Sequence, residues 1–207
     1  MAGTFETNVF INCPYDAAFM RLLRPLVFTV IFAGLTPRLS LEQMDSGEAR
    51  IQKIARLISE SKYAIHDISR MQADGAGETF RLNMPFELGL DIGCRLFAED
   101  VRSEKRCLIL ERERYRFQAA ISDLSNSDIG AHGDVPEEVV AVVRDWLNCE
   151  AGCELPGPSR VWGAFLEFIA DDFAALKAKK YTKRDIERLP LVELMTHMRT
   201  WVAVHNT

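Results

Sequence analysis

The sequence lacks the features of membrane, secreted and nucleic-acid-coating proteins. None of its apolar runs reaches the roughly 18 residues that a membrane-spanning helix needs, and the nearest candidate, residues 22–35, is interrupted by Arg24, Pro25 and Gly34. The first residues have neither the basic nor the long apolar region of a secretory signal peptide. Lysine and arginine number 25 against 30 acidic residues, so the dense positive face that binds a nucleic-acid polymer is absent. We expect neither a membrane nor a nucleic-acid polymer as partner.

The cysteines show neither a disulfide framework nor a metal-binding pattern. The five cysteines are an odd, scattered set, which favours reduced thiols and a cytoplasmic location. Cys149 and Cys153 are separated by three residues, but no second Cys/His pair with metal-ligand spacing accompanies them. Walker, GxGxxG and HExxH motifs are also missing. The sequence therefore predicts no metal site and no resident cofactor.

The 207 residues, of which 48% are hydrophobic and 27% charged, are typical of a globular protein with one large domain or one domain and an appendage. Residues 1–150 alternate between patterns of period 2 and period 3.6. The predicted strands cover residues 8–13, 35–41, 62–68, 106–110 and part of 127–133. The predicted helices follow Asp16, follow a capping box at Asp45 and Glu48, run from Pro85 to about Phe97, lie near 118–124 and cover 137–148. This order predicts a flavodoxin-like α/β fold, a parallel sheet of about five strands with helices on both faces.

The last part of the chain has a different composition. Residues 149–160 are rich in glycine and proline, and residues 161–179 and 182–204 have helical periodicity with apolar faces. We expect a C-terminal helical extension, residues 160–207, packed on the α/β domain or on a second subunit, and we expect the protein to form a homo-oligomer.

Glu87 is the strongest candidate for a catalytic residue. The pattern places it in the first turn of the helix that begins near Pro85, where the helix dipole favours an ionised carboxylate. Gly89 and Gly93, four residues apart, are expected to let this helix pack closely on the sheet. Such a carboxylate can act as a nucleophile or stabilise an oxocarbenium ion at a glycosidic centre. The alternative is that Glu87 only complements the helix dipole.

Other polar residues converge on the same edge, because ligands of such sheets bind at the carboxyl ends of the strands. Asp67 is suited to accept hydrogen bonds from ribose hydroxyls, and Tyr15 to orient Glu87 or stack on a base. Cys13 and His66 could imitate a Cys/His pair, although a buried structural thiol is favoured, and His132 either borders the site or caps a turn. The substrate-binding candidates are Asn12, Pro14, Tyr15, Arg38, Arg50, Asp67, Ser69, Arg81 and Asn83.

Three segments carry a resemblance to a known superfamily. The run 9–14 (VFINCP), the strand end at Asp67 and the run 84–89 (MPFELG) resemble the nucleoside 2-deoxyribosyltransferase-like and bacterial TIR-like superfamily, over roughly residues 8–147. The resemblance implies a flavodoxin-like sheet, cleavage of N-glycosidic bonds, Glu87 as the catalytic carboxylate and Asp67 as a sugar contact. The loop at residues 12–15 corresponds to the one that shapes the sugar pocket.

Departures from the pattern separate the branches. Asn83-Met-Pro85 stands where deoxyribosyltransferases usually have a small cluster such as Ser-Gly-Thr, and the chain is longer than their minimal form. These differences favour the TIR-like branch that cleaves NAD, which is then a substrate and not a cofactor, and a role in antiphage defence follows from the same resemblance. Arg38, Arg50 and Arg81, expected near strand ends or helix starts, suit a pyrophosphate. Arg50 also follows Asp45-Ser-Gly47, an anion-binding type of turn.

Two other functions remain open from the sequence. One is deoxyribosyl transfer or hydrolysis of deoxynucleotides, which base exchange between deoxynucleosides would reveal. The other is a non-catalytic module that senses a nucleotide or assembles with TIR-like partners, for which the apolar C-terminal helices are the motivation. In each case the ligand is a small nucleotide.

Overall fold

The computed structural model describes residues 3–42, 45–71, 82–119, 121–124 and 127–205. Five parallel strands form one sheet in the order β2-β1-β3-β4-β5. The strands are β1 (Asn8–Asn12), β2 (Thr36–Arg38), β3 (Tyr63–Asp67), β4 (Arg106–Glu111) and β5 (Ile129–Ala131). This is the flavodoxin-like order. The chain adds β2 on one side of β1 and the later strands on the other side, so the strand order reverses between β1 and β3. The predicted fold class is therefore confirmed, and the carboxyl ends of β1 and β3 flank the switch point.

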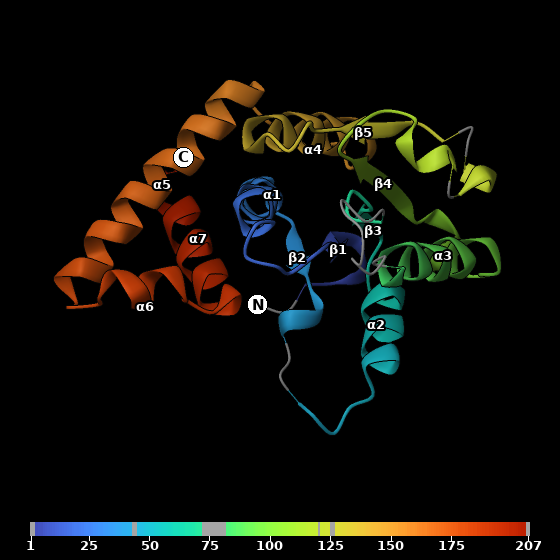
Figure 1. Cartoon of the computed structure of the whole chain (residues 1–207), viewed down its shortest axis with the longest axis horizontal. Helices are drawn as coiled ribbons and strands as arrows, with labels where there is room; N and C mark the ends of the chain where they lie inside the picture. Colours follow the sequence, from blue (N-terminus) through green and yellow to red (C-terminus); the bar gives the residue numbers. More distant parts are fainter. Residues whose placement is uncertain (1–2, 43–44, 72–81, 120, 125–126, 206–207) are drawn as a thin grey trace, which may run out of the picture.

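Helices cover both faces of the sheet (Figure 1). On one face lie α1 (Met20–Phe32) and α4 (Pro136–Glu150), and on the other lie α2 (Arg50–Ser59) and α3 (Asn83–Leu96). Side chains alternate along β1 between the two: Val9 and Ile11 join the hydrophobic cluster of α1, while Phe10 joins that of α2. Both faces of β1 and β3 are covered, which explains why all their residues are buried.

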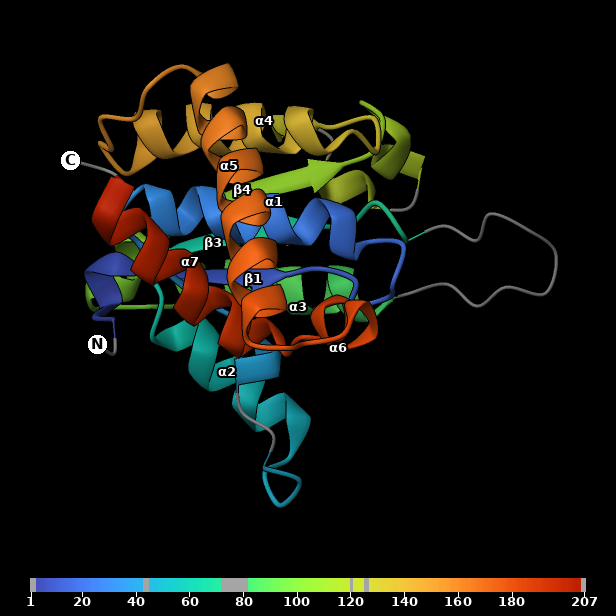
Figure 2. The same cartoon turned by 90° about the vertical axis from the view of Figure 1, so that its left-hand side faces the viewer.

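The C-terminal part consists of α5 (Pro158–Ala178), α6 (Lys183–Glu187) and α7 (Leu191–His205), which Figure 2 shows in front of α1. Phe28 of α1 contacts the rings of Phe165 and Phe168 of α5 and of Trp201 of α7. These helices thus share one hydrophobic cluster with α1 and the sheet. Residues 182–204, predicted to be helical, form two helices, because helix α6 ends before Pro190, which has no N–H to continue a helix.

Several element boundaries differ from the prediction. Strand β2 ends at Arg38 and not at 41, because the Leu39 N–H donates to the Glu42 carboxylate (2.7 Å) and the chain turns into a 3-10 helix. The predicted capping box at Asp45 and Glu48 does not form, because α2 begins only at Arg50. Asp45 instead accepts a hydrogen bond from the Gly47 N–H (2.8 Å), and Glu48 pairs with Arg56.

Two further local differences concern helices. Asp16 accepts from the Phe19 N–H (2.8 Å), but α1 itself begins at Met20 and contains Pro25. The short helix expected near 118–124 is two 3-10 turns, Arg116–Ala119 and Ser122–Leu124. Within the described residues, no helix is both long enough and apolar enough to cross a membrane. All five cysteines are free.

Candidate functional site

Glu87 lies on the buried side of α3. Its exposed fraction is 5%. The helix begins at Asn83, so Glu87 stands in the second turn and not the first, where the dipole effect is weaker. Burial raises the pKa of the Glu87 carboxyl, and the charges of Arg50 and His66 only partly counter that rise. A carboxyl group with such a perturbed pKa at a ligand-binding edge is a candidate for catalysis.

Arg50 is the cation closest to this carboxylate among the ion pairs of the described residues. It is the first residue of α2, and its Nη2 lies 3.4 Å from Oε1 of Glu87. The structure therefore brings together two residues that the sequence predicted separately. The Arg50 guanidinium is largely exposed, so it can contact an anion that arrives from solvent while it remains near Glu87.

The end of β1 is tied to the start of α3 by Asn12. Its amide Nδ2 donates to the Met84 carbonyl (2.9 Å) and lies 3.1 Å from Nδ1 of His66. Both residues are buried, so this contact fixes where α3, and with it Glu87, stands against the sheet. Pro14, next in the predicted set, is buried, and Asn83 is exposed at the first residue of α3.

Tyr15 and Cys13 lie within the electrostatic influence of Glu87. Burial raises the pKa of both groups, and the negative charge of Glu87 raises it further. The Tyr15 hydroxyl accepts a hydrogen bond from Ser40 (3.3 Å). A thiol in this environment stays protonated, and both nitrogens of His66 contact other residues, so the geometry disfavours a Cys13/His66 nucleophile.

Asp67 is held from two sides at the end of β3. Its Oδ1 accepts from the backbone N–H (3.0 Å) and the hydroxyl of Ser69, and its Oδ2 lies 3.1 Å from Nε2 of His132. His132 Nδ1 accepts from the Asp134 N–H (3.0 Å), which leaves Nε2 of the same ring close to the Asp67 carboxylate without a hydrogen bond between them. His132, which follows β5, is thus a direct neighbour of Asp67.

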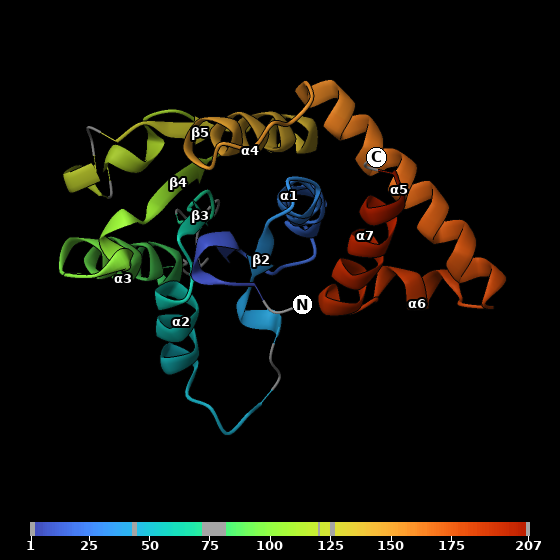
Figure 3. The ribbon, with the colours of Figure 1, turned by 180° about the vertical axis from the view of Figure 1, so that it is seen from behind.

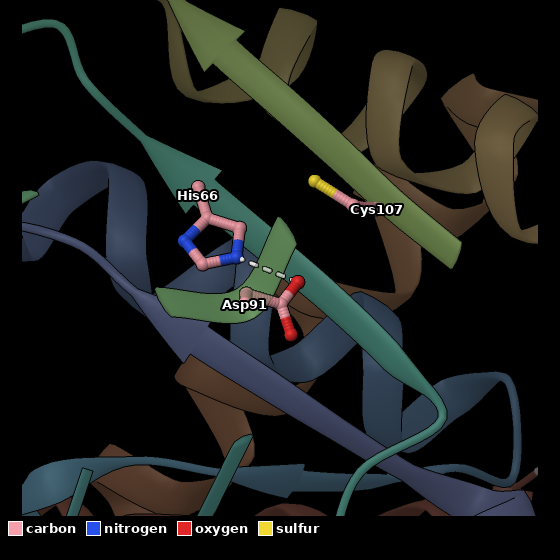
Figure 4. A group of neighbouring side chains, drawn as sticks. All are labelled: His66, Asp91 and Cys107. Carbon is pink, nitrogen blue, oxygen red and sulfur yellow. Dashed lines mark hydrogen bonds and ion pairs between the residues drawn. The ribbon is translucent and has the colours of Figure 1, made fainter. Parts of the chain in front are cut away.

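Asp91 of α3 and His66 of β3 belong to a second buried polar group (Figure 4). His66 Nε2 lies 3.2 Å from Oδ2 of Asp91, and Lys105 Nζ lies 2.9 Å from Oδ1 of Asp91. Burial alone would raise the pKa of Asp91, but His66 and Lys105 together outweigh it and lower that pKa. Lys105 also donates to the carbonyls of Ile58 and Ser61 at the end of α2. Sequence reasoning missed this ion pair, because lysine is rarely buried.

The atoms of His66, Asp91 and Cys107 that could ligate a metal lie within 4.8 Å of one another. Their surroundings do not suit a cation, however. The Lys105 ammonium already faces Asp91, and burial raises the pKa of Cys107, which keeps the thiol protonated. We therefore regard this cluster as a structural contact between α3 and the sheet.

Not every predicted residue joins the site. The Arg38 guanidinium pairs with Glu42 (3.0 Å) and Glu60 (3.1 Å). Glu60 also accepts, through its carbonyl, from Asn8, the first residue of β1. Arg38 is therefore directed towards the amino ends of the strands and away from Glu87. Arg81 lies outside the described residues.

The carboxyl edge thus gathers Glu87, Arg50, Asn12, Tyr15, Asp67 and Ser69 around the switch point. No protein-family model, no curated protein and no solved structure matches this chain.

Proposed function

We propose that this protein cleaves the N-glycosidic bond of NAD. The carrying observation is Glu87, a buried carboxylate at the carboxyl edge of a flavodoxin-like sheet with an exposed arginine 3.4 Å away. The proposal also rests on the resemblance of residues 84–89 to the catalytic segment of the deoxyribosyltransferase-like and TIR-like superfamily.

In the proposed reaction, the bond between the ribose anomeric carbon and the nicotinamide nitrogen breaks, and its electron pair leaves with nicotinamide. The Glu87 carboxylate stabilises or traps the resulting ribosyl cation. Water then adds to the anomeric carbon and loses one proton, so that NAD and water give nicotinamide, ADP-ribose and a proton.

The neighbouring residues supply binding. Asp67, oriented by Ser69, accepts hydrogen bonds from the ribose hydroxyls through its Oδ2, which has no hydrogen-bond partner among the described residues. Arg50 contacts the pyrophosphate, and this contact favours a dinucleotide over a nucleoside, which carries no such charge. The arrangement therefore supports NAD more strongly than a deoxynucleoside.

Nicotinamide release from NAD by the purified full chain tests the proposal. We expect release by the native chain and loss of at least 99% of it in Glu87→Gln, about the effect of removing one group that acts on the transition state. Glu60→Gln, at the far edge of the sheet, is the matched control and should retain activity. No release at any protein concentration, or full activity of Glu87→Gln, would refute the proposal, whereas base exchange between deoxynucleosides without NAD cleavage would assign the site to deoxyribosyl transfer.

A further inference from the structure

The C-terminal helices line a cavity of about 210 Å³ where they meet α1. Figure 3 shows α5, α6 and α7 grouped on the side of the molecule that carries α1. All four helices contribute to the lining, and so does the turn between α6 and α7. The apolar part of the lining consists of Ile169, Phe173, Ile186, Leu189 and Leu194. An apolar cavity of about 150 Å³ holds a benzene molecule, so this cavity has room for a ring with a small polar group.

Arg24 of α1 lines the same cavity, and the hydrogen bonding of its guanidinium is incomplete. Its Nη2 donates to the carbonyl of Glu187, the last residue of α6 (3.3 Å). This bond uses one of the five N–H donors of a guanidinium. Nε is buried and has no hydrogen-bond partner in the part of the chain that the structure describes. A buried donor that is left unpaired costs free energy, so a further acceptor would stabilise this side chain.

The other charged residues of the cavity already have partners. Lys183 Nζ lies 3.7 Å from Oε1 of Glu187. Asp172 Oδ1 lies 2.8 Å from Nδ1 of His197 on α7. Arg24, by contrast, forms no ion pair with a carboxylate of the described residues. It is therefore the charged group of this lining that lacks a counter-ion, and the partner that fits it is an anion.

We propose that this cavity binds a small carboxylic acid in its ionised form. The carboxylate accepts hydrogen bonds from the Arg24 guanidinium, whose planar donors match the geometry of two carboxylate oxygens. The apolar body of the ligand fills the space between Ile169, Leu189 and Leu194. An inorganic anion such as phosphate has no apolar body to place there, and the volume is too small for a segment of a partner protein.

Binding at this place joins two parts of the chain. Arg24 belongs to α1 and thus to the α/β domain, whereas the apolar lining belongs to residues 169–194. A ligand that contacts both parts binds only while the C-terminal helices are docked on α1, so it stabilises the folded chain. The cavity is also separate from Glu87, because α1 covers the opposite face of the sheet from α3. The inference therefore does not depend on NAD cleavage.

Calorimetric titration of the full chain with four small molecules tests the site. Benzoate, hexanoate or both should bind with a Kd of about 1 mM or less, the range open to ligands of this size. Benzamide keeps the shape of benzoate without its charge, and acetate keeps the charge without the ring. Each of these two should bind at least about tenfold more weakly than benzoate, since each lacks one of the two contacts. Saturating benzoate should also raise the Tm of the chain.

Three variants test the assigned residues. Arg24→Gln should weaken benzoate binding at least about tenfold, because the charge-assisted hydrogen bonds are lost. Arg21→Gln, which removes an exposed arginine one turn earlier on α1, is the matched control and should bind benzoate as the native chain does. Ile169→Trp should fill the cavity and abolish binding while Arg24 is intact, which keeps the test valid if Arg24→Gln does not fold. Urea unfolding shows which variants are folded.

Three results would overturn the proposal. If neither benzoate nor hexanoate binds the native chain, the cavity is not a carboxylate site. Equal affinities for benzoate and benzamide would show that the charge of Arg24 plays no part. Binding by folded Arg24→Gln or Ile169→Trp chains that equals native binding would place the carboxylate elsewhere on the molecule. Each result can be obtained whether or not the chain cleaves NAD.

Discussion

Oε1 of Glu87 lies 3.4 Å from Nη2 of Arg50, and the two side chains of this pair differ widely in exposure, 6% against 58%. The carboxylate is held in the interior by α3, while its cation reaches solvent from the start of α2. Because water screens the charge of the exposed Arg50 guanidinium, this ion pair contributes little to the stability of the fold. It leaves Glu87 with a raised pKa and Arg50 available to a ligand.

Glu87→Gln should change how stability depends on pH. Since burial raises the pKa of Glu87, the folded chain binds this proton more tightly than the unfolded chain. The resulting stability is fully present below the ordinary pKa of 4.5 and is lost as pH rises through the raised pKa. The glutamine variant cannot show this loss. Urea unfolding at several pH values should find a variant that gains stability relative to the native chain between pH 4.5 and neutrality, and a pH-independent difference would contradict the burial argument.

If the chain cleaves NAD as proposed, Arg50→Gln should alter both substrate binding and the pH profile of that cleavage. Arg50 lowers the pKa of Glu87, so its removal raises that pKa, and the acidic limb of the activity profile moves to higher pH. The lost contact with pyrophosphate should raise KM for NAD about tenfold, the effect of one charge-assisted hydrogen bond. Arg38→Gln serves as control, because Arg38 faces Glu42 and Glu60; an equal effect of both variants would remove Arg50 from the site.

Lys105→Met should destabilise the fold by about 3–5 kcal/mol, because it leaves the buried Asp91 charge without its cation. Asp91→Asn removes that charge, so Lys105→Met should cost less in an Asp91→Asn background. A double-mutant cycle by urea denaturation measures this coupling, expected at about 1–3 kcal/mol. Additive effects of the two substitutions would mean that the pair contributes nothing beyond its separate contacts.

Two glycines offer a matched test of packing. A Cβ on Gly130 of β5 would collide with the Val142 side chain of α4 and stand 3.0 Å from Leu110, so Gly130→Ala should lower stability by about 1–3 kcal/mol. Gly163 lies inside α5 with no described atom within 4 Å of its Cβ position, so Gly163→Ala should raise stability by about 0.5–1 kcal/mol. Thermal unfolding of both variants measures the two shifts, and shifts of the same sign would contradict the packing of β5 on α4.

Local patterns were enough to predict the sheet. Residues 8–12 and 63–67 are short, mostly apolar runs, and such runs predict strands that are covered on both faces. Their alternation with helical segments predicts a parallel sheet. The edge that gathers Asn12, Asp67 and Glu87 follows from that order, because the carboxyl ends of parallel strands lie together.

What the patterns could not predict depends on contacts distant in sequence. The direction of Arg38 is decided by Glu60, 22 residues away, and the burial of Lys105 by Asp91 and by the end of α2. The orientation of α3 was wrongly expected because apolar residues normally point inward. Here Glu87 and Asp91 share the inward side with Met84 and Leu88, while Phe86 and Gly89 point outward. The predicted close packing of Gly89 on the sheet is therefore wrong, since no described atom lies within 4 Å of its Cβ position.

The central position of α1 has a consequence for how this chain folds during synthesis. Ten of its 13 residues are buried, some of them against α5 and α7. Ribosomes deliver the amino-terminal part first. Until residues 158–205 have been made, the side of α1 that carries Phe28 therefore has no cover from its own chain, and a nascent chain at this stage is a natural client for chaperones that bind exposed apolar surface.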